Sequence, residues 1–102
     1  MSAAWKSALS KNLQELRLLV STTSPGSKGL REFVENSYIE LKKSNPLFPI
    51  LVREKTEVDA TVIARYEYGV EQAVRVEGMD QGQVAKAVQL LVEQGQQESS
   101  SS

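Results

Sequence analysis

Two serines at the end of the first apolar segment are the residues whose spacing most suggests chemistry. The apolar run ends at Val20, and Ser21 and Ser24 follow in a polar turn before a segment with helical periodicity. In dithiol oxidoreductases two cysteines occupy such a strand–helix junction, because the N-terminus of a helix lowers the pKa of a thiol. This chain contains no cysteine. The spacing therefore predicts a scaffold suited to thiol chemistry that lacks the thiols.

The composition excludes further kinds of site. Neither cysteine nor histidine occurs, so the chain lacks the usual zinc ligands and the usual general base near neutral pH. The 12 basic and 13 acidic residues nearly cancel, which leaves no overall positive field to attract nucleic acid or anionic lipid. No apolar run approaches the ~18 residues of a transmembrane helix. We therefore predict no catalytic residue, no cofactor site, no metal site and no membrane span.

We divide the 102 residues into an N-terminal arm (1–12), one α/β domain (13–95) and a disordered tail (96–102). The arm is rich in serine and alanine and carries no acidic residue. Two interpretations of it are open. It is either a basic amphipathic segment of the mitochondrial-import type, with Trp5 and Leu9 on one side, or a flexible leader with an incidental tryptophan.

The first half of the domain predicts a strand, a helix and a second strand. A strand is predicted from about Leu13 or Glu15 to Val20. It has leucines on both faces, which favours a central strand with both faces covered by other elements. Ser24 is the expected helix cap, Pro25 suits the first helical position, and the apolar stripe runs on towards Lys43. Residues 49–53, almost wholly apolar, read as a parallel strand. Together they form a right-handed βαβ unit.

The second half predicts a β-hairpin and a helix. Alternation over 62–68 indicates a strand, and residues 73–76 return as its partner. Tyr66 and Tyr68 share one face of the first of these strands, which favours core packing over a ligand platform. The final helix begins at the capping box formed by Asp80 and Gln83, and Gly95 is expected to end it.

This order of elements predicts an α/β, thioredoxin-like fold: a four-stranded mixed sheet with helices on both faces. Several short strings also carry a family resemblance: Leu16-Arg17-Leu18, Ser24-Pro25-Gly26-Ser27, Gly29-Leu30-Arg31-Glu32-Phe33, Tyr38, Glu40-Leu41-Lys42-Lys43, Asn45-Pro46, Pro49-Ile50-Leu51, Arg53-Glu54 and Ala64-Arg65-Tyr66. In order and spacing they resemble the small thioredoxin-like accessory subunit of the alpha subcomplex of mitochondrial NADH:ubiquinone oxidoreductase, respiratory complex I. The resemblance covers about residues 13–92.

The resemblance implies a non-catalytic subunit that supports assembly or stability of the matrix arm. It also implies a peripheral location on the matrix side of the inner mitochondrial membrane, with other complex I subunits as partners, the large iron–sulfur subunit foremost, and no nucleic acid. Family members often carry cysteines at the positions of Ser21 and Lys55, for which a redox-sensitive disulfide has been considered. Neither residue forms one here. The cis-proline typical of thioredoxins is also missing, because residues 59–62 contain no proline.

Other interpretations are open for particular residues and for the whole chain. Arg53, Glu54 and Arg65 are candidate partner contacts, and the alternative is an internal set of ion pairs at strand ends. Ser21 and Ser24 are more simply explained as loop and cap residues than as remnants of an active site. The alternative function is that of a mitochondrial ribosomal protein with the same domain. The near-neutral charge argues against it, because such proteins contact RNA.

Overall fold

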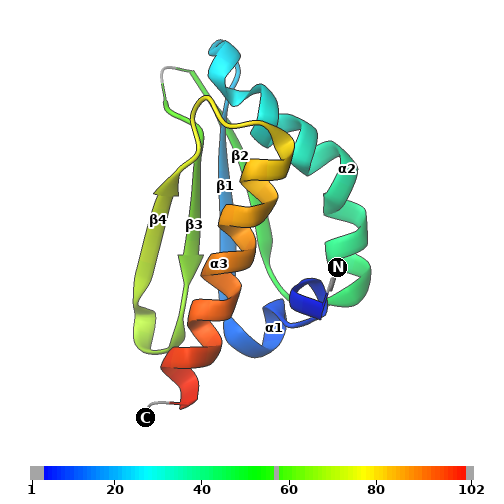
Figure 1. The fold of residues 1–102 in the computed structure, drawn as a ribbon, viewed down its shortest axis with the longest axis vertical. Coiled ribbons are helices and arrows are strands. Elements are labelled where there is room, and N and C mark those ends of the chain that lie inside the picture. Colours follow the sequence, from blue (N-terminus) through cyan, green and yellow to red (C-terminus); the bar gives the residue numbers. More distant parts are fainter. Residues whose placement is uncertain (1–3, 57, 101–102) are drawn as a thin grey trace.

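A computed structural model of the chain describes residues 4–56 and 58–100. Short 3-10 turns and helices alternate with four strands that form one sheet (Figure 1). In chain order the elements are η1 (Ala4–Ser7), α1 (Leu9–Asn12), β1 (Glu15–Ser21), η2 (Pro25–Ser27), α2 (Lys28–Ser44), β2 (Ile50–Lys55), β3 (Thr61–Arg65), η3 (Glu67–Gly69), β4 (Glu71–Arg75) and α3 (Gln81–Ser100).

The sheet has the strand order β2-β1-β3-β4. Leu18 in β1 pairs in register with Val52 of the parallel strand β2 and with Val62 of the antiparallel strand β3. Strand β4 then pairs antiparallel with β3. These pairings confirm the predicted βαβ unit, the hairpin and the four-stranded mixed sheet, and they are compatible with a thioredoxin-like arrangement.

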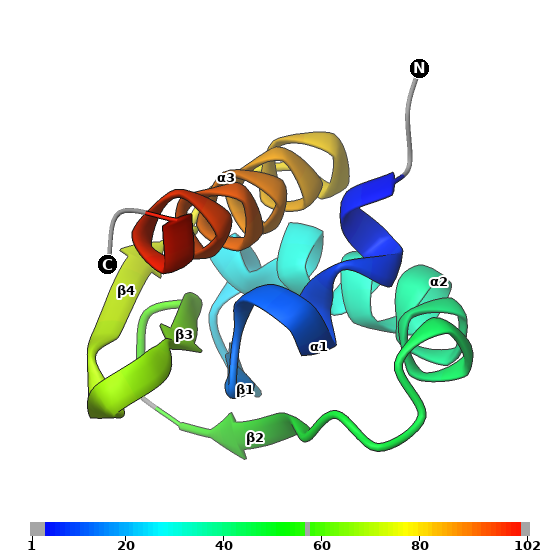
Figure 2. The same cartoon turned by 90° about the horizontal axis from the view of Figure 1, so that it is seen from below.

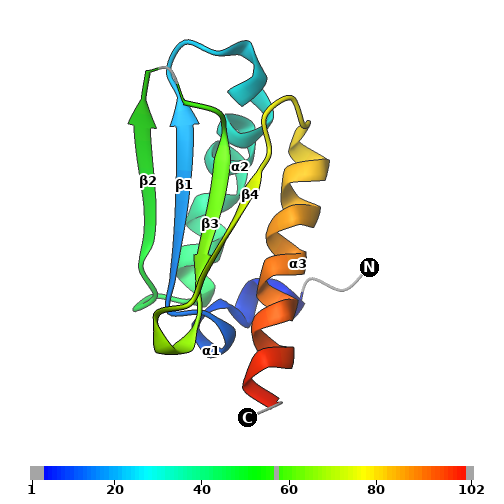
Figure 3. The same cartoon turned by 90° about the vertical axis from the view of Figure 1, so that its left-hand side faces the viewer.

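Both long helices lie on the same face of the sheet. Figures 2 and 3 show α2 and α3 on the same side of the sheet, while the opposite face carries no helix of the described chain. The prediction that helices cover both faces is therefore wrong. The connection from β2 to β3, residues 56–60, is too short to carry a helix across the second face, since each helical residue adds only about 1.5 Å.

The hydrophobic core lies between the sheet and the two helices. The strands contribute alternate residues, and Leu16, Leu18 and Val20 of β1 are buried, whereas Leu19 on the other face is half-buried. Helix α2 buries Phe33 among its apolar residues. The predicted stripe of α3 is confirmed by burial of the following residues: Val84, Val88, Leu91 and Val92. Apolar burial on one sheet face thus holds the layers together.

Local hydrogen bonds set the helix starts as the sequence predicts. The Ser24 hydroxyl accepts a hydrogen bond from the backbone N–H of Gly26 (3.2 Å) at the start of η2, which leads into α2. At the start of α3 the Gln83 backbone N–H donates to Asp80 Oδ1 (2.8 Å), and the Asp80 backbone N–H donates to Gln83 Oε1 (3.0 Å). This reciprocal pair is a capping box.

Helix α3 does not end at Gly95, contrary to the prediction, and continues through residues 96–100, where a tail was expected. Residues 101 and 102 lie outside the described part of the chain. Gly95 is buried, and a Cβ at this position would overlap the backbone carbonyl of Asn12 and crowd the ring of Tyr66. The glycine permits close packing of α3 on the N-terminal segment instead of ending the helix.

The two tyrosines after β3 have different environments. Tyr66 is buried, and its hydroxyl donates to the backbone carbonyl of Leu91 in α3 (2.7 Å). Tyr68 is 91% exposed and lies in η3 at a positive φ of 64°. Core packing is thus confirmed for Tyr66 and wrong for Tyr68, because β3 ends at Arg65 and the chain turns before the alternation can continue.

The described part of the N-terminal arm packs into the domain. Trp5 and Leu9 are buried against the core. The buried side chain of Asn45 accepts from the Ser10 backbone N–H (3.2 Å) and donates to the Lys6 carbonyl (2.6 Å). A flexible leader with an incidental tryptophan is therefore the wrong interpretation of residues 4–12. The import interpretation stays a prediction.

Candidate functional site

The strand–helix junction uses the polar groups of Ser21 to shape its own turn. The side chain is fully buried, and its hydroxyl oxygen accepts hydrogen bonds from the backbone N–H groups of Thr23 (3.2 Å) and Ser24 (2.9 Å). The Ser21 carbonyl accepts from the Arg31 guanidinium (2.6 Å), and its N–H donates to Ser27 Oγ (2.9 Å). The arrangement organises the loop and supplies no base to activate the hydroxyl as a nucleophile.

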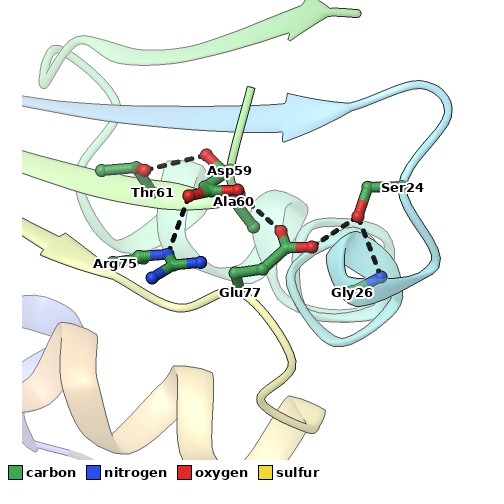
Figure 4. Close-up of polar contacts among 7 residues, drawn as sticks. All are labelled: Ser24, Gly26, Asp59, Ala60, Thr61, Arg75 and Glu77. Carbon is green, nitrogen blue, oxygen red and sulfur yellow. Dashed lines mark hydrogen bonds and ion pairs between the residues drawn. The ribbon is translucent and has the colours of Figure 1, made fainter. Parts of the chain in front are cut away.

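A carboxylate of the chain occupies the neighbouring position at the start of the helix. In Figure 4 Glu77, from the β4–α3 connection, accepts hydrogen bonds from the Ser24 hydroxyl and from the backbone N–H of Ala60, the latter at 2.8 Å. A Cβ at Gly26 would overlap this carboxylate, so glycine leaves the space that Glu77 fills. The site is therefore closed by internal contacts among three loops.

The same hydrogen bonds set the ionisation of Glu77. The N–H of Ala60, then the Ser24 hydroxyl, lower the pKa of Glu77 below its ordinary value of 4.5, because both donate to the charged form. Partial desolvation opposes this shift, and the nearby charge of Arg75 adds to it. Sequence reasoning missed this residue. Glu77 is 53 positions from Ser24 in the chain, and no local pattern connects them.

Ser21 and Lys55, the positions for which the resemblance implies cysteines in relatives, are neighbours in the sheet. Ser21 and Lys55 are register partners on the parallel strands β1 and β2, and the Thr22 backbone N–H donates to the Lys55 carbonyl (3.0 Å). Ser21 is buried and Lys55 is exposed. The two positions are therefore adjacent in the backbone register, whereas the Ser21 hydroxyl faces the loop at Thr23 and Ser24.

The predicted partner contacts divide between the two sides of β2 and β3. Arg53 and Arg65 lie on the face without helices, and Glu54 points to the other side at the end of β2. All three are exposed, and none forms an ion pair with any residue of 4–56 or 58–100. The described residues thus give no support to the alternative of an internal ion-pair set.

The uncovered side of the sheet, which we call the open sheet face, forms a shallow depression of about 530 Å³. Its lining residues are Glu15, Arg17, Leu19, Leu51, Arg53, Lys55, Ile63 and Arg65. Arg17 pairs with Glu15 (2.8 Å) and with Glu71 across the sheet. The face therefore combines half-buried apolar side chains with a surplus of positive charge.

The residues that the structure describes form neither a cluster of metal ligands nor a membrane-spanning helix. No group of three or more carboxylate, histidine or cysteine residues there is placed to hold a metal ion. No described helix is both long and apolar enough to cross a bilayer.

The known proteins that are similar to this chain agree with one another. The sequence model of the mitochondrial ribosomal protein L51 / S25 / CI-B8 domain matches residues 30–81. The NADH dehydrogenase [ubiquinone] 1 alpha subcomplex subunit 2 of Arabidopsis thaliana is 44% identical over 92 residues, which is 90% of this chain and 95% of the relative. Its mouse counterpart, from Mus musculus, is 42% identical over 77 residues, 76% of this chain and 78% of the relative. The chain belongs to this alpha subcomplex subunit 2 family.

The ribosomal alternative has a weaker match than the alpha subcomplex subunit 2 family. The large ribosomal subunit protein mL43 of Mus musculus is 29% identical over 84 residues, which is 82% of this chain but 46% of mL43. The chain thus matches the alpha subcomplex subunit 2 proteins over most of their length and mL43 over less than half. The domain is shared, and the closer sequence similarity lies with the respiratory proteins.

Proposed function

We propose that this chain is a non-catalytic accessory subunit of mitochondrial respiratory complex I that supports assembly or stability of its matrix arm. The observation that carries the proposal is the 44% identity with the Arabidopsis alpha subcomplex subunit 2 over 90% of this chain and 95% of that protein. The similarity thus extends over nearly the whole of both chains.

The chemistry of the strand–helix junction supports a role without catalysis. The chain has no cysteine and no histidine, and the Ser21 and Ser24 hydroxyls are engaged in loop contacts. Glu77 occupies the helix start, where a substrate anion or thiolate would otherwise be stabilised. The chain therefore contributes shape and surface to a larger assembly.

We further propose that the chain docks peripherally on the matrix side of the inner membrane, against the large iron–sulfur subunit. The sequence resemblance over residues 13–92 supports this placement. Arg53 and Arg65, which are exposed and form no ion pair within residues 4–56 and 58–100, are the contacts we assign to a partner, together with Glu54. Arginine suits such a role because its guanidinium binds a carboxylate through two parallel hydrogen bonds.

Disruption of the gene tests the proposal directly. We expect less assembled complex I on native gels of mitochondrial membranes, and recovery when the unmodified chain is re-expressed. Mass spectrometry of the purified complex should identify the chain at a constant ratio to the other subunits. Purified complex I that reproducibly lacks the chain would contradict the proposal.

Sedimentation separates this role from the ribosomal alternative. Detergent-solubilised mitochondria are resolved on a density gradient, and the chain is followed together with a complex I marker and a ribosomal marker. We expect the chain in the complex I fractions, unchanged by ribonuclease. Sedimentation with ribosomes that ribonuclease abolishes would favour the ribosomal role instead.

A further inference from the structure

The open sheet face presents apolar side chains that no described element covers. Leu51 lies beside Arg17, and Arg17 lies beside Ile63, in one row across the strands. Leu19 lies in the adjacent row beside Arg53. The three apolar side chains are half-buried, and both long helices lie on the opposite face (Figures 2 and 3). An apolar strip in this setting is typical of an interaction surface.

Three cations surround this strip, and none has an ion-pair partner among the residues that the structure describes. Arg53, Lys55 and Arg65 are exposed, and none of them makes an ion pair within the described ranges. Arg17, on the same face, is by contrast held by the two acidic residues Glu15 and Glu71. Arg53, Lys55 and Arg65 therefore leave a positive charge at the edge of the depression, although the whole chain has a formal net charge of −1.

We infer that the open sheet face is the docking surface for an acidic segment of a neighbouring protein subunit, whose carboxylates pair with Arg53, Lys55 and Arg65 and whose apolar side chains cover Leu19, Leu51 and Ile63. This inference rests on the proposed function, since it requires a larger assembly. Arg53 and Lys55 are two residues apart on β2, so their side chains point the same way and match alternate carboxylates of an extended acidic segment. The apolar strip supplies the dry centre, and the cations supply the charged rim.

The composition of the face favours a protein partner over RNA. None of the described residues that line the depression is aromatic, so no side chain there can stack on a base. Glu15 is the register partner of Arg65, and Glu71 is its partner on the other side, so carboxylates flank this cation in its row. Those acids would repel a continuous phosphate backbone, whereas a protein segment can place its few carboxylates between them.

Charge reversal on the assembled complex tests the docking surface. The chain carrying Arg53→Glu and Arg65→Glu is re-expressed in cells that lack the endogenous copy, and its share in the complex I fractions is compared with that of the unmodified chain. We expect this share to fall at least about tenfold, because each substitution places a carboxylate opposite those of the partner segment, and like charges in contact at an interface disfavour binding. Lys86→Glu is the matched control. Lys86 is exposed on α3 on the helical side, and we expect this variant to assemble like the unmodified chain.

A zero-length cross-link gives a second readout that does not depend on a variant folding. A carbodiimide joins a lysine amine to a carboxylate in direct contact, and it is applied to the intact complex carrying the unmodified chain. We expect peptides that link Lys55 to an aspartate or glutamate of another subunit. The link should disappear in Lys55→Arg, which keeps the charge and removes the reactive amine.

The outcomes separate this inference from the proposed function. Normal assembly of the double variant, or cross-links from Lys86 and none from Lys55, would overturn the inference while leaving the role in complex I intact. Absence of the unmodified chain from complex I would overturn the proposed function itself. Ribosomal sedimentation that the double variant and ribonuclease both abolish would identify RNA as the partner of this face and also overturn the inference.

Discussion

Single side chains in this protein join segments that are far apart in the sequence. Glu77 connects the start of α2 with the β2–β3 connection through Ser24 and Ala60. Asn45 fastens the N-terminal arm to the end of α2 in the same way. In both cases a buried or half-buried polar side chain satisfies backbone groups that would otherwise lose hydrogen bonds on folding.

The ionisation of Glu77 predicts a pH dependence of stability. Its pKa in the folded state is lowered, so folding favours the charged form. Its contribution to the free energy of unfolding is therefore present above the ordinary pKa of 4.5 and is lost as the pH falls through the lower, folded-state pKa. We expect the stability difference between the unmodified chain and Glu77→Gln to be constant near neutrality and to shrink on acidification below that value.

Denaturant titrations at a series of pH values measure this difference. Ser24→Ala removes one of the two donors to Glu77 and leaves the other, from Ala60. It should reduce the pH dependence without abolishing it. Parallel stability profiles for the unmodified chain and Glu77→Gln over the acidic range would show that the carboxylate contributes nothing to folding as an anion.

At the scale of elements, the packing of α2 positions the rest of the chain. Phe33 is buried between this helix and its neighbours, whereas Ile39 on the same helix is 66% exposed. Gly29 lies where a Cβ would overlap the backbone carbonyl of Met79, so the first turn of α2 approaches the β4–α3 connection closely. The position of α2 is therefore fixed by its buried apolar side chains and by the close backbone contact that Gly29 permits.

Truncation of Phe33 should destabilise the domain strongly. We expect Phe33→Ala to lower the free energy of unfolding by about 3 to 5 kcal/mol, because the ring leaves a cavity in a well-packed core. Ile39→Ala, on the exposed side of the same helix, should change it by less than about 1 kcal/mol. Urea titration of both variants measures the contrast, and equal effects would contradict the packing of α2.

Alanine substitutions at Gly29 and Gly82 should affect the stability of the domain differently. Gly29→Ala forces the helix away from Met79 and should cost about 1 to 3 kcal/mol, the range for overpacked sites. At Gly82 a Cβ would come no closer than 3.4 Å to Asp80 Oδ1, which is ordinary contact. Gly82→Ala should therefore be neutral or stabilise by up to about 1 kcal/mol, through reduced freedom of the unfolded chain. Thermal unfolding of both variants decides the point.

At the scale of the whole molecule, residues 4–12 of the N-terminal segment pack into the same hydrophobic core as the sheet. Trp5 and Leu9 are part of the core, and the Asn12 side chain donates to the Val92 carbonyl in α3 (2.9 Å). The described chain therefore closes its core at one end with residues that precede the first strand. Removing them would expose that end of the core to water.

Trp5 is the single tryptophan and reports on this closure. We expect its fluorescence and the far-ultraviolet circular dichroism to change with one common midpoint in a denaturant titration, as in two-state unfolding. Trp5→Phe, which keeps an apolar ring, serves as the control for the fluorescence signal. A tryptophan transition at lower denaturant than the loss of secondary structure would mean that the arm detaches independently of the domain.

Short-range patterns of the sequence were sufficient to predict the starts of the two long helices and the strand β1. The cap at Ser24 and the capping box of Asp80 with Gln83 depend on contacts within three residues, so the chain order contains them directly. The alternation in β1 likewise predicts a strand. The end of α3 was predicted wrongly. Gly95 lies inside the helix, where the backbone carbonyl of Asn12 approaches too closely for a Cβ, and no local sequence pattern contains this distant contact.

The sequence by itself determined the order of strands and helices, the βαβ unit and hairpin, and the lack of thiol and imidazole chemistry, because these follow from residue types and from contacts between near neighbours. Only the tertiary structure decided that one sheet face is open, that Glu77 closes the strand–helix junction, and that Arg53 and Arg65 share a surface while Glu54 does not. These features depend on how distant segments meet in space, and hydrophobic periodicity does not specify which face the helices cover.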